Sequence, residues 1–434
     1  MEIHKPSTVV PLRHGVAVVT FLLGIAIAFG AALWVPYFLA VRLASIRLLT
    51  FSSVATFGLV MWLAGEAAAT LWGTTRHSRA ALLLSGTITP IFLAALYVTI
   101  LRPSVSGLPD VHPYPNTRYW QLTTGSLIAY SEYDPPPGTV VNPIPIVYLH
   151  GGPGARQTPV DQAVYGSFAA QGFRVFLFDQ AGSGLSGLLP HVHDYTVERC
   201  VSDLEAVRQK IGAEKMNLIG HSWGSTLAAS YMAKYPSHVA KVAFLSPSKI
   251  WNLEDENYNF SRTDENRSIP PPLRFSAALM LRDRNPDASE NLLPQREAET
   301  LAPPSLLRTF GSLVCAGDSK RLPLNLFSGF NPYLVPELIP DTSNRENDPH
   351  EALRRNQTPA ILLYPECNYL AWNGALDYRK TLPNLKIYYI PHAGHYIQIE
   401  RPGLLKRLIL AFLLDQPDPI PPYKSDADPR TNRP

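Results

Sequence analysis

The chain has 434 residues, enough for about three domains of ordinary size, and only 17% of them are charged, against about 25% in an average globular protein. The net charge is unevenly divided, since residues 1–102 carry +5 and the remaining residues carry −2. The larger, near-neutral part has no basic stripe to neutralise phosphates, so nucleic acid is not an expected partner. Three widely spaced cysteines form no C-x-x-C pair and leave the redox compartment open.

Three long runs without charged residues open the chain, at 15–41, 48–65 and 80–101. Because about 20 apolar residues span a bilayer as a helix, we expect residues 1–102 to be a membrane region with three transmembrane helices, at about 15–41, 48–72 and 80–101. A cleaved signal peptide would have one short apolar run instead. The alternative is a buried helical subdomain. A lipid bilayer is therefore an expected partner.

Three crossings would place the N-terminus and the rest of the chain on opposite sides of the membrane. Four basic residues would lie on the same side of the membrane as the N-terminus, namely Lys5, Arg13, Arg76 and Arg79. Three would lie on the opposite side, namely Arg42, Arg47 and Arg102. The positive-inside rule then favours, by this narrow margin, an external C-terminal domain.

From about residue 118, short β-rich runs alternate with helical segments, which predicts a mostly parallel sheet with helices on both faces. The segments RYWQLTT and SLIAYSEY predict an opening antiparallel pair. Further strands are expected at 143–150, 173–179, 216–221, 239–246, 359–364 and 385–390, and helices at 197–211 and 223–235.

The domain boundaries follow from changes in this alternation. Residues 248–356 break it and are rich in Pro, Asn, Asp and Glu, so we expect an inserted, mostly helical cap between core segments 103–247 and 357–415. Residues 416–434 have too few apolar side chains to fold and are expected to be disordered.

The strongest chemical signal is Gly220-His221-Ser222-Trp223-Gly224, between a predicted strand and an alanine-rich helix. This is G-x-S-x-G in a strand-turn-helix context, where the glycines allow a tight turn that exposes the serine hydroxyl. Ser222 is therefore the candidate nucleophile. An ordinary glycine-rich turn is the alternative.

A second signal, HGGPG at 150–154, follows a predicted strand, and its glycines let backbone N–H groups approach a substrate carbonyl oxygen as an oxyanion hole requires. The expected partner donor is the amide of Trp223. A phosphate-binding loop is the competing interpretation, but neither G-K-[ST] nor G-x-G-x-x-G occurs here.

A third signal, His392-Ala393-Gly394-His395, follows the last predicted strand and gives the chain order serine then histidine. His395, which follows glycine at the tip of the loop, is the better candidate for the general base. We interpret His392 as structural.

These motifs resemble the α/β-hydrolase fold and, within it, the proline iminopeptidase-like serine hydrolases. HGGPG, DQAGSGLS, GHSWGS, YPECNYLAW and HAGHY occur in family order across residues 118–415. The resemblance implies Ser222 as nucleophile, His395 as base, and the amides of Gly152 and Trp223 as the oxyanion hole. It does not extend to the first 102 residues and is weak in the cap.

The sequence departs from the family at the triad acid. The family has an aspartate where this chain has Asn368, and an asparagine orients an imidazole without stabilising the imidazolium by charge. Glu366, Asp377 and Asp255 are the alternative acids. Asn368 is retained as the orienting residue.

The leading functional hypothesis is a membrane-anchored serine hydrolase that acts through an acyl-enzyme, and the family resemblance implies an aminopeptidase that acts on short peptides. An esterase or lipase acting on membrane-derived acyl esters is the nearest alternative. A non-catalytic membrane receptor or scaffold on a degenerate hydrolase fold is the third, motivated by Asn368. No cofactor and no metal ligand set is predicted, and a small molecule or short peptide is the expected substrate.

Overall fold

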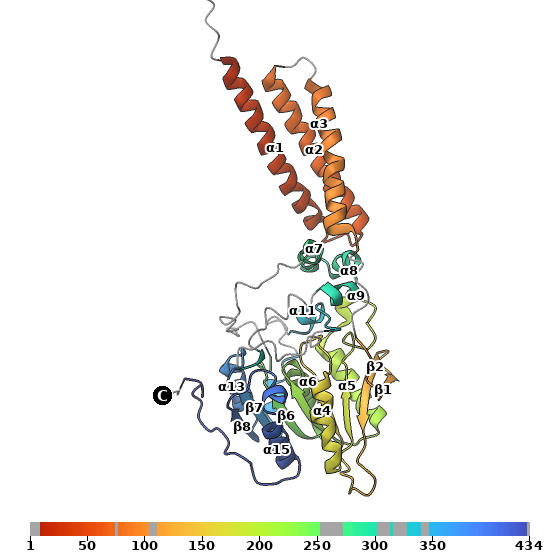
Figure 1. The fold of residues 1–434 in the computed structure, drawn as a ribbon, viewed down its shortest axis with the longest axis vertical. Helices are drawn as coiled ribbons and strands as arrows, with labels where there is room; N and C mark the ends of the chain where they lie inside the picture. The colour runs from red at the N-terminus through yellow and green to blue at the C-terminus, as the bar shows by residue number, and fades with distance from the viewer. Residues whose placement is uncertain are drawn as a thin grey trace, which may run out of the picture. The chain divides into compact units, whose positions relative to one another are not determined.

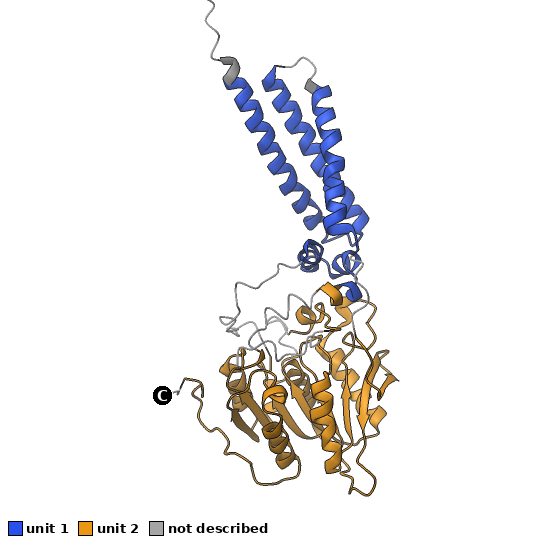
Figure 2. Cartoon of the chain, viewed as in Figure 1, with its two compact units in different colours: residues 1–105, 271–297 blue, residues 106–270, 298–434 orange. Residues whose placement is uncertain are grey.

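A computed structural model of the chain describes residues 9–73, 77–103, 111–251, 272–301, 313–315, 328–339 and 347–431. The chain divides into two compact units, one of residues 1–105 and 271–297, the other of residues 106–270 and 298–434 (Figure 2).

The first unit is built around three long helices, α1 (Val9–Leu39), α2 (Ile46–Trp72) and α3 (His77–Leu96), the last continuing into the π-helical turn η1 (Tyr97–Leu101) (Figure 1). Three segments, Leu12–Leu39, Ile46–Trp72 and Ser78–Leu101, are long and apolar enough to cross a membrane. Large apolar side chains remain exposed along them. The prediction of three long apolar helices is confirmed, with bounds a few residues from those expected.

Small residues let these helices approach closely. A Cβ atom on Gly24 would lie 2.2 Å from the Cβ atom of Ala64, so α1 and α2 are in contact at a glycine. The Ser53 hydroxyl of α2 donates to the Ala32 carbonyl of α1 at 2.8 Å. Small side chains and interhelical serine hydrogen bonds are typical of helix packing in membranes.

Two short helices from the predicted cap, α7 (Leu273–Arg282) and α8 (Pro286–Leu292), belong to this first unit. Asn285 donates to the Ala40 carbonyl just past the end of α1, and Asn291 donates to the Ala44 carbonyl. The 248–356 segment is thus divided between the units. These hydrogen bonds and the buried contact of Ala288 in α8 with Ala40 and Leu49 join α7 and α8 to the long helices.

The second unit is an eight-stranded sheet in the order β1-β2-β4-β3-β5-β6-β7-β8, in which β1–β2 and β2–β4 are antiparallel and the other pairs are parallel. This confirms the predicted mostly parallel sheet. The strands are β1 (Thr117–Gln121), β2 (Leu127–Tyr133), β3 (Ile146–Leu149), β4 (Val175–Phe178), β5 (Met216–His221), β6 (Val239–Leu245), β7 (Ala360–Pro365) and β8 (Leu385–Ile390).

Helices cover both faces of this sheet, so its central strands are buried and read as continuous apolar runs. One face packs against α5, α6 and α13, and the other against α4 and α15. The longer helices are α4 (Pro159–Gly166), α5 (Val197–Ile211), α6 (Trp223–Lys234), α13 (Trp372–Thr381) and α15 (Pro402–Leu413). The shorter ones are η2 (Ser167–Gln171), η3 (Val192–Asp194), η4 (Pro236–His238), α9 (Gln295–Leu301), α11 (Leu334–Leu338), α12 (His350–Arg354) and α14 (Ile397–Glu400).

The C-terminal tail differs from the disordered segment that its composition predicts. The Tyr423 N–H donates to the Ile387 carbonyl of β8, and the Trp372 indole donates to the Asp426 carbonyl. Arg379 adds a hydrogen bond to the Tyr423 carbonyl. Backbone hydrogen bonds and a few aromatic contacts hold residues 416–431, which a count of apolar residues does not reveal.

Candidate active site

Ser222 lies on the sharp turn between β5 and α6. Its backbone has φ 52° and ψ −120°, a conformation that residues with a side chain rarely adopt. A Cβ atom on Gly220 would lie 2.4 Å from the Gly224 carbonyl oxygen, and one on Gly224 would lie 2.1 Å from the Leu149 carbonyl oxygen. Both glycines are therefore required sterically, and the turn has the geometry that G-x-S-x-G predicts.

The HGGPG segment after β3 lies against this turn. A Cβ atom on Gly151 would come within 2.9 Å of the Ser222 Cβ atom. The backbone next to Gly152 therefore lies beside the serine, and the Trp223 amide opens α6 directly after it. These are the positions from which two amides could stabilise an oxyanion, and that role stays a prediction.

Gln180 links the turn to the HGGPG segment. The Trp223 indole donates to the Gln180 side-chain oxygen at 3.2 Å, and the Gln180 side-chain amide donates to the His150 carbonyl at 2.9 Å. The Gln180 backbone N–H also donates to the His150 ring. Gln180 is buried and belongs to the DQAGSGLS motif, and the motif by itself does not indicate this linking role.

His395, beyond β8, is fully buried and is joined to Asn368 beyond β7. The His395 Nδ1 atom and the Asn368 Oδ1 atom are 2.8 Å apart. Because an amide oxygen only accepts, the imidazole donates from Nδ1, which leaves Nε2 as the proton acceptor. The His395 carbonyl accepts hydrogen bonds from the His221 ring and the Ser246 hydroxyl, which fix its backbone.

The electrostatic surroundings of His395 favour the neutral imidazole. Burial is the main cause that holds the pKa of His395 well below its usual range, and His221 lowers it further. The pKa of His221 is itself lowered to about 4 by burial. Asn368, which is hydrogen-bonded to His395, carries no negative charge that would oppose this shift.

The alternative acids have other partners. Glu366 accepts a hydrogen bond from the His392 backbone N–H, and the His392 side chain is exposed. Asp377 accepts from the Ile250 backbone N–H and pairs with the His350 ring. Asp255 lies outside the described residues. Of the three candidates among the described residues, Asn368 is the one that is hydrogen-bonded to His395.

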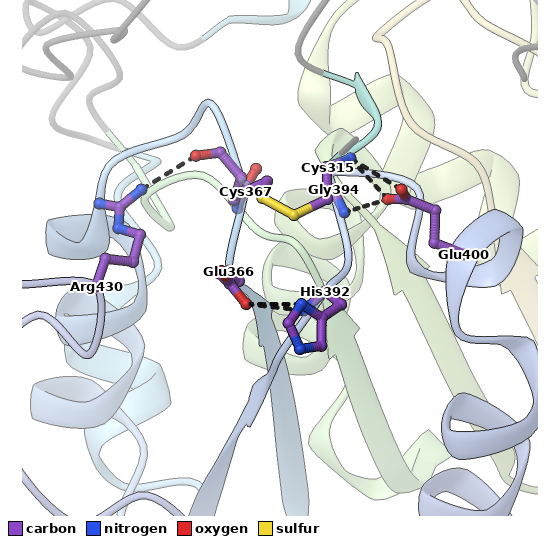
Figure 3. Close-up of a disulfide and its surroundings, with 8 residues drawn as sticks. Cys315, Glu366, Cys367, His392, Gly394, Glu400 and Arg430 are labelled. Carbon is purple, nitrogen blue, oxygen red and sulfur yellow. Dashed lines mark hydrogen bonds and ion pairs between the residues drawn. A yellow bond between two sulfur atoms is a disulfide. The ribbon is translucent and has the colours of Figure 1, made fainter. Parts of the chain in front are cut away.

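A disulfide joins Cys315 to Cys367, the residue before Asn368 (Figure 3). The Cys367 N–H donates to the Ala393 carbonyl, so the bridge ties residue 315 to both loops that carry the candidate site. The cysteine count and the separation of 52 residues gave no signal of this pairing. Cys200 is buried and unbridged.

Glu400 supports the same loops from α14. Its carboxylate accepts hydrogen bonds from the Gly394 and Cys315 backbone N–H groups (Figure 3). It therefore fixes the turn directly before His395, and no motif in the sequence indicates this role.

Arg430, in the C-terminal tail, reaches back to the Asn368 loop. Its Nη1 atom donates to the Asn368 carbonyl at 3.0 Å, while its other nitrogens bind Asp428. The guanidinium also lies 5.2 Å from the centre of the Tyr364 ring at the end of β7. The tail is thus part of the structure around Asn368.

Comparisons with known proteins agree with this architecture. Residues 144–306 match the family model described as the alpha/beta hydrolase fold. The chain is 32% identical over 143 residues to a proline iminopeptidase of Heyndrickxia coagulans, and 36% identical over 121 residues to one of Neisseria gonorrhoeae. These matches cover 32% and 28% of this chain and 46% and 36% of the relatives, so the chain spans less than half the length of either.

Solved structures show the same fold at lower sequence identity. A thermophilic esterase from Thermogutta terrifontis superposes with a TM-score of 0.50 at 18% identity, covering 69% of this chain and 98% of the esterase. The esterase RhEst1 from Rhodococcus sp. gives a TM-score of 0.50 at 18% identity, covering 70% of this chain and all of that protein. Together with the sheet order and the turn at Ser222, these matches show that the chain has the α/β-hydrolase fold and is similar in sequence to proline iminopeptidases.

Proposed function

We propose that this protein is a membrane-anchored serine hydrolase that acts through an acyl-enzyme, and that it removes N-terminal residues from short peptides. The observation that carries the proposal is the combination of Ser222 on its sharp turn with His395 held by Asn368. The similarity to proline iminopeptidases supports the aminopeptidase activity.

In the proposed mechanism, the Ser222 hydroxyl oxygen attacks the substrate carbonyl carbon while His395 Nε2 accepts the hydroxyl proton. The Gly152 and Trp223 amides stabilise the oxyanion. The C–N bond then breaks, and the leaving amine takes the proton from His395. Water, deprotonated by His395, cleaves the acyl ester and restores Ser222.

Asn368 sets a limit on the rate of this mechanism. It holds the imidazole in the correct tautomer, but it carries no charge to stabilise the imidazolium that forms in both steps. In a serine protease the change from aspartate to asparagine lowers turnover about 10⁴-fold. We therefore expect a slow enzyme.

An aminopeptidase also needs a group that holds the substrate ammonium. The sequence offers carboxylates in the predicted cap, of which those at 254–265 lie outside the described residues. Glu297 forms a buried ion pair with Arg274 within the first unit. We therefore propose that a carboxylate among residues 254–265 binds the substrate ammonium.

Esterase or lipase activity on membrane-derived acyl esters is the second candidate. Three helices long enough to cross a membrane, in the same chain as the hydrolase fold, favour it. An ester substrate needs no carboxylate for an ammonium group, so the two candidates differ in the charge they require near Ser222.

We further propose that the hydrolase domain lies on the external side of the membrane. The Cys315–Cys367 disulfide supports this orientation, because disulfides persist in oxidising compartments and are rare in the cytosol. The excess of basic residues on the opposite side of the spans agrees with it.

The direct test is labelling with a fluorophosphonate, followed by kinetics on aminoacyl amides and acyl esters. Full-length protein should be labelled at Ser222, and Ser222→Ala should lose both labelling and turnover. Ser237→Ala is the matched control, because Ser237 is exposed and remote from the turn in sequence. Absence of labelling in the wild type would favour the non-catalytic receptor, whereas turnover of esters alone would favour the esterase.

A further inference from the structure

The first unit contains an open groove of about 760 Å³ at the end where α2 begins and η1 ends. Its walls are mostly apolar and come from α2, α3 and η1, with Phe51, Val54, Leu93 and Tyr97 among them. The charged residues that line it are Arg47, at the start of α2, and the pair Arg274 and Glu297. The groove is thus apolar along the helices and charged at one end.

The charges at this end are not equivalent. Arg274 is buried and forms a two-pronged ion pair with Glu297, and its Nη1 atom also donates to the Ile100 and Leu101 carbonyls. Arg274 therefore neutralises Glu297 and fixes the end of η1. Arg47 is exposed and has no hydrogen bond or ion pair to another described residue. The groove consequently carries one uncompensated positive charge.

We propose that this groove binds one anionic glycerophospholipid, with an acyl chain along Phe51, Val54 and Leu93 and the phosphate at Arg47. An apolar groove that ends at the unpaired guanidinium of Arg47 matches a molecule with a hydrocarbon tail and an anionic head. The inference rests on the proposed membrane anchoring of α1–α3.

The position of Arg47 along its helix fits a lipid headgroup. It is the second residue of a segment long enough to span a bilayer, so its guanidinium would reach the headgroup layer while its stem lies against hydrocarbon. The chain leaves the same end of the bundle after Arg102. The bound lipid would therefore belong to the leaflet that faces the hydrolase domain.

The test is native mass spectrometry of full-length protein, titrated with phosphatidylglycerol and with phosphatidylcholine that carry identical acyl chains. We expect the wild type to prefer phosphatidylglycerol about five-fold, the factor expected for one basic residue at a membrane surface. Arg47→Gln should abolish the preference. Arg42→Gln is the matched control, because Arg42 is an exposed arginine five residues earlier that does not line the groove.

A second pair of variants tests the apolar part. Val54→Trp should fill the groove and reduce retention of both lipids, whereas Leu48→Trp, at an exposed position outside it, should not. Equal binding of the two lipids by the wild type, or a preference that survives Arg47→Gln, overturns the lipid site. Resistance of the chain to carbonate extraction reports on anchoring independently, so failure of the lipid site and failure of anchoring are distinguishable.

Discussion

Among single residues, Asn368 has the largest effect on the proposed chemistry, because its amide is neutral. It fixes the tautomer of His395 with a 2.8 Å hydrogen bond, yet it leaves burial and His221 to lower the pKa of that imidazole unopposed. His395 should therefore stay unprotonated, and able to act as a base, at mildly acidic pH. The same shift makes the imidazolium that forms in the transition state less stable.

Asn368→Asp should supply the missing charge. We expect turnover to rise, by at most the about 10⁴-fold that the reverse change costs in a serine protease. A carboxylate also raises the pKa of the neighbouring imidazole, so the acid limb of the kcat/KM profile should move to higher pH. The measurement is kcat/KM against pH for both proteins.

Amide variants of the alternative acids provide the controls. Glu366→Gln, Asp377→Asn and Asp255→Asn should each change kcat/KM far less than the Asn368 variant changes it. A large loss in one of the three, together with no gain from Asn368→Asp, would show that the negative charge comes from that residue instead.

At the scale of elements, the loops after β7 and β8 are held by supports from distant parts of the chain. The disulfide brings in residue 315, Glu400 brings in α14, and Arg430 brings in the tail. Each support acts on the backbone next to Asn368 or His395. Loss of one of these supports should therefore shift the positions of Asn368 and His395, although both residues remain present.

The disulfide can be tested by counting thiols in the denatured protein. A maleimide tag should react with one cysteine, Cys200, before reduction and with all three after it. Cys367→Ser should lower the free energy of unfolding by about 2–4 kcal/mol, the usual contribution of a native bridge, and so lower the thermal midpoint. Three reactive thiols without reductant would contradict the bridge.

The contact of the tail gives a separate prediction. Arg430→Ala should lower kcat several-fold with little change in KM, because the guanidinium holds the Asn368 carbonyl rather than the substrate. Lys424→Ala removes the same charge from an exposed position in the same tail and serves as the control. Equal effects of the two substitutions would mean that the tail acts through charge alone.

For the molecule as a whole, the proposed membrane anchoring rests on three helices that are long and apolar enough to cross a bilayer. Full-length protein should remain in the membrane after an alkaline carbonate wash, since apolar spans leave only when the bilayer is disrupted. Protease added outside intact cells should cleave the hydrolase domain if that domain is external. Release by carbonate would show that residues 1–102 do not span the membrane, and protection from protease would reverse the orientation.

Features that depend on residues close together in the chain could be predicted from the sequence. Buried strands read as apolar runs, and the β5 and β8 bounds coincide with those expected. The turn at Ser222 was predictable because its glycines are required within a few residues of chain. Three long apolar runs predicted three long helices, because a run of about 20 apolar residues can cross a bilayer only if its backbone groups are hydrogen-bonded within the segment.

The tertiary structure decided which distant groups meet. His395 is paired with Asn368 rather than with Glu366 or Asp377 because of how two loops meet at one edge of the sheet. The same holds for the Cys315–Cys367 bridge, for the hydrogen bonds of the tail, and for the grouping of α7 and α8 with the N-terminal helices. These partners are tens to hundreds of residues apart, and no local pattern of polarity encodes a contact over that separation.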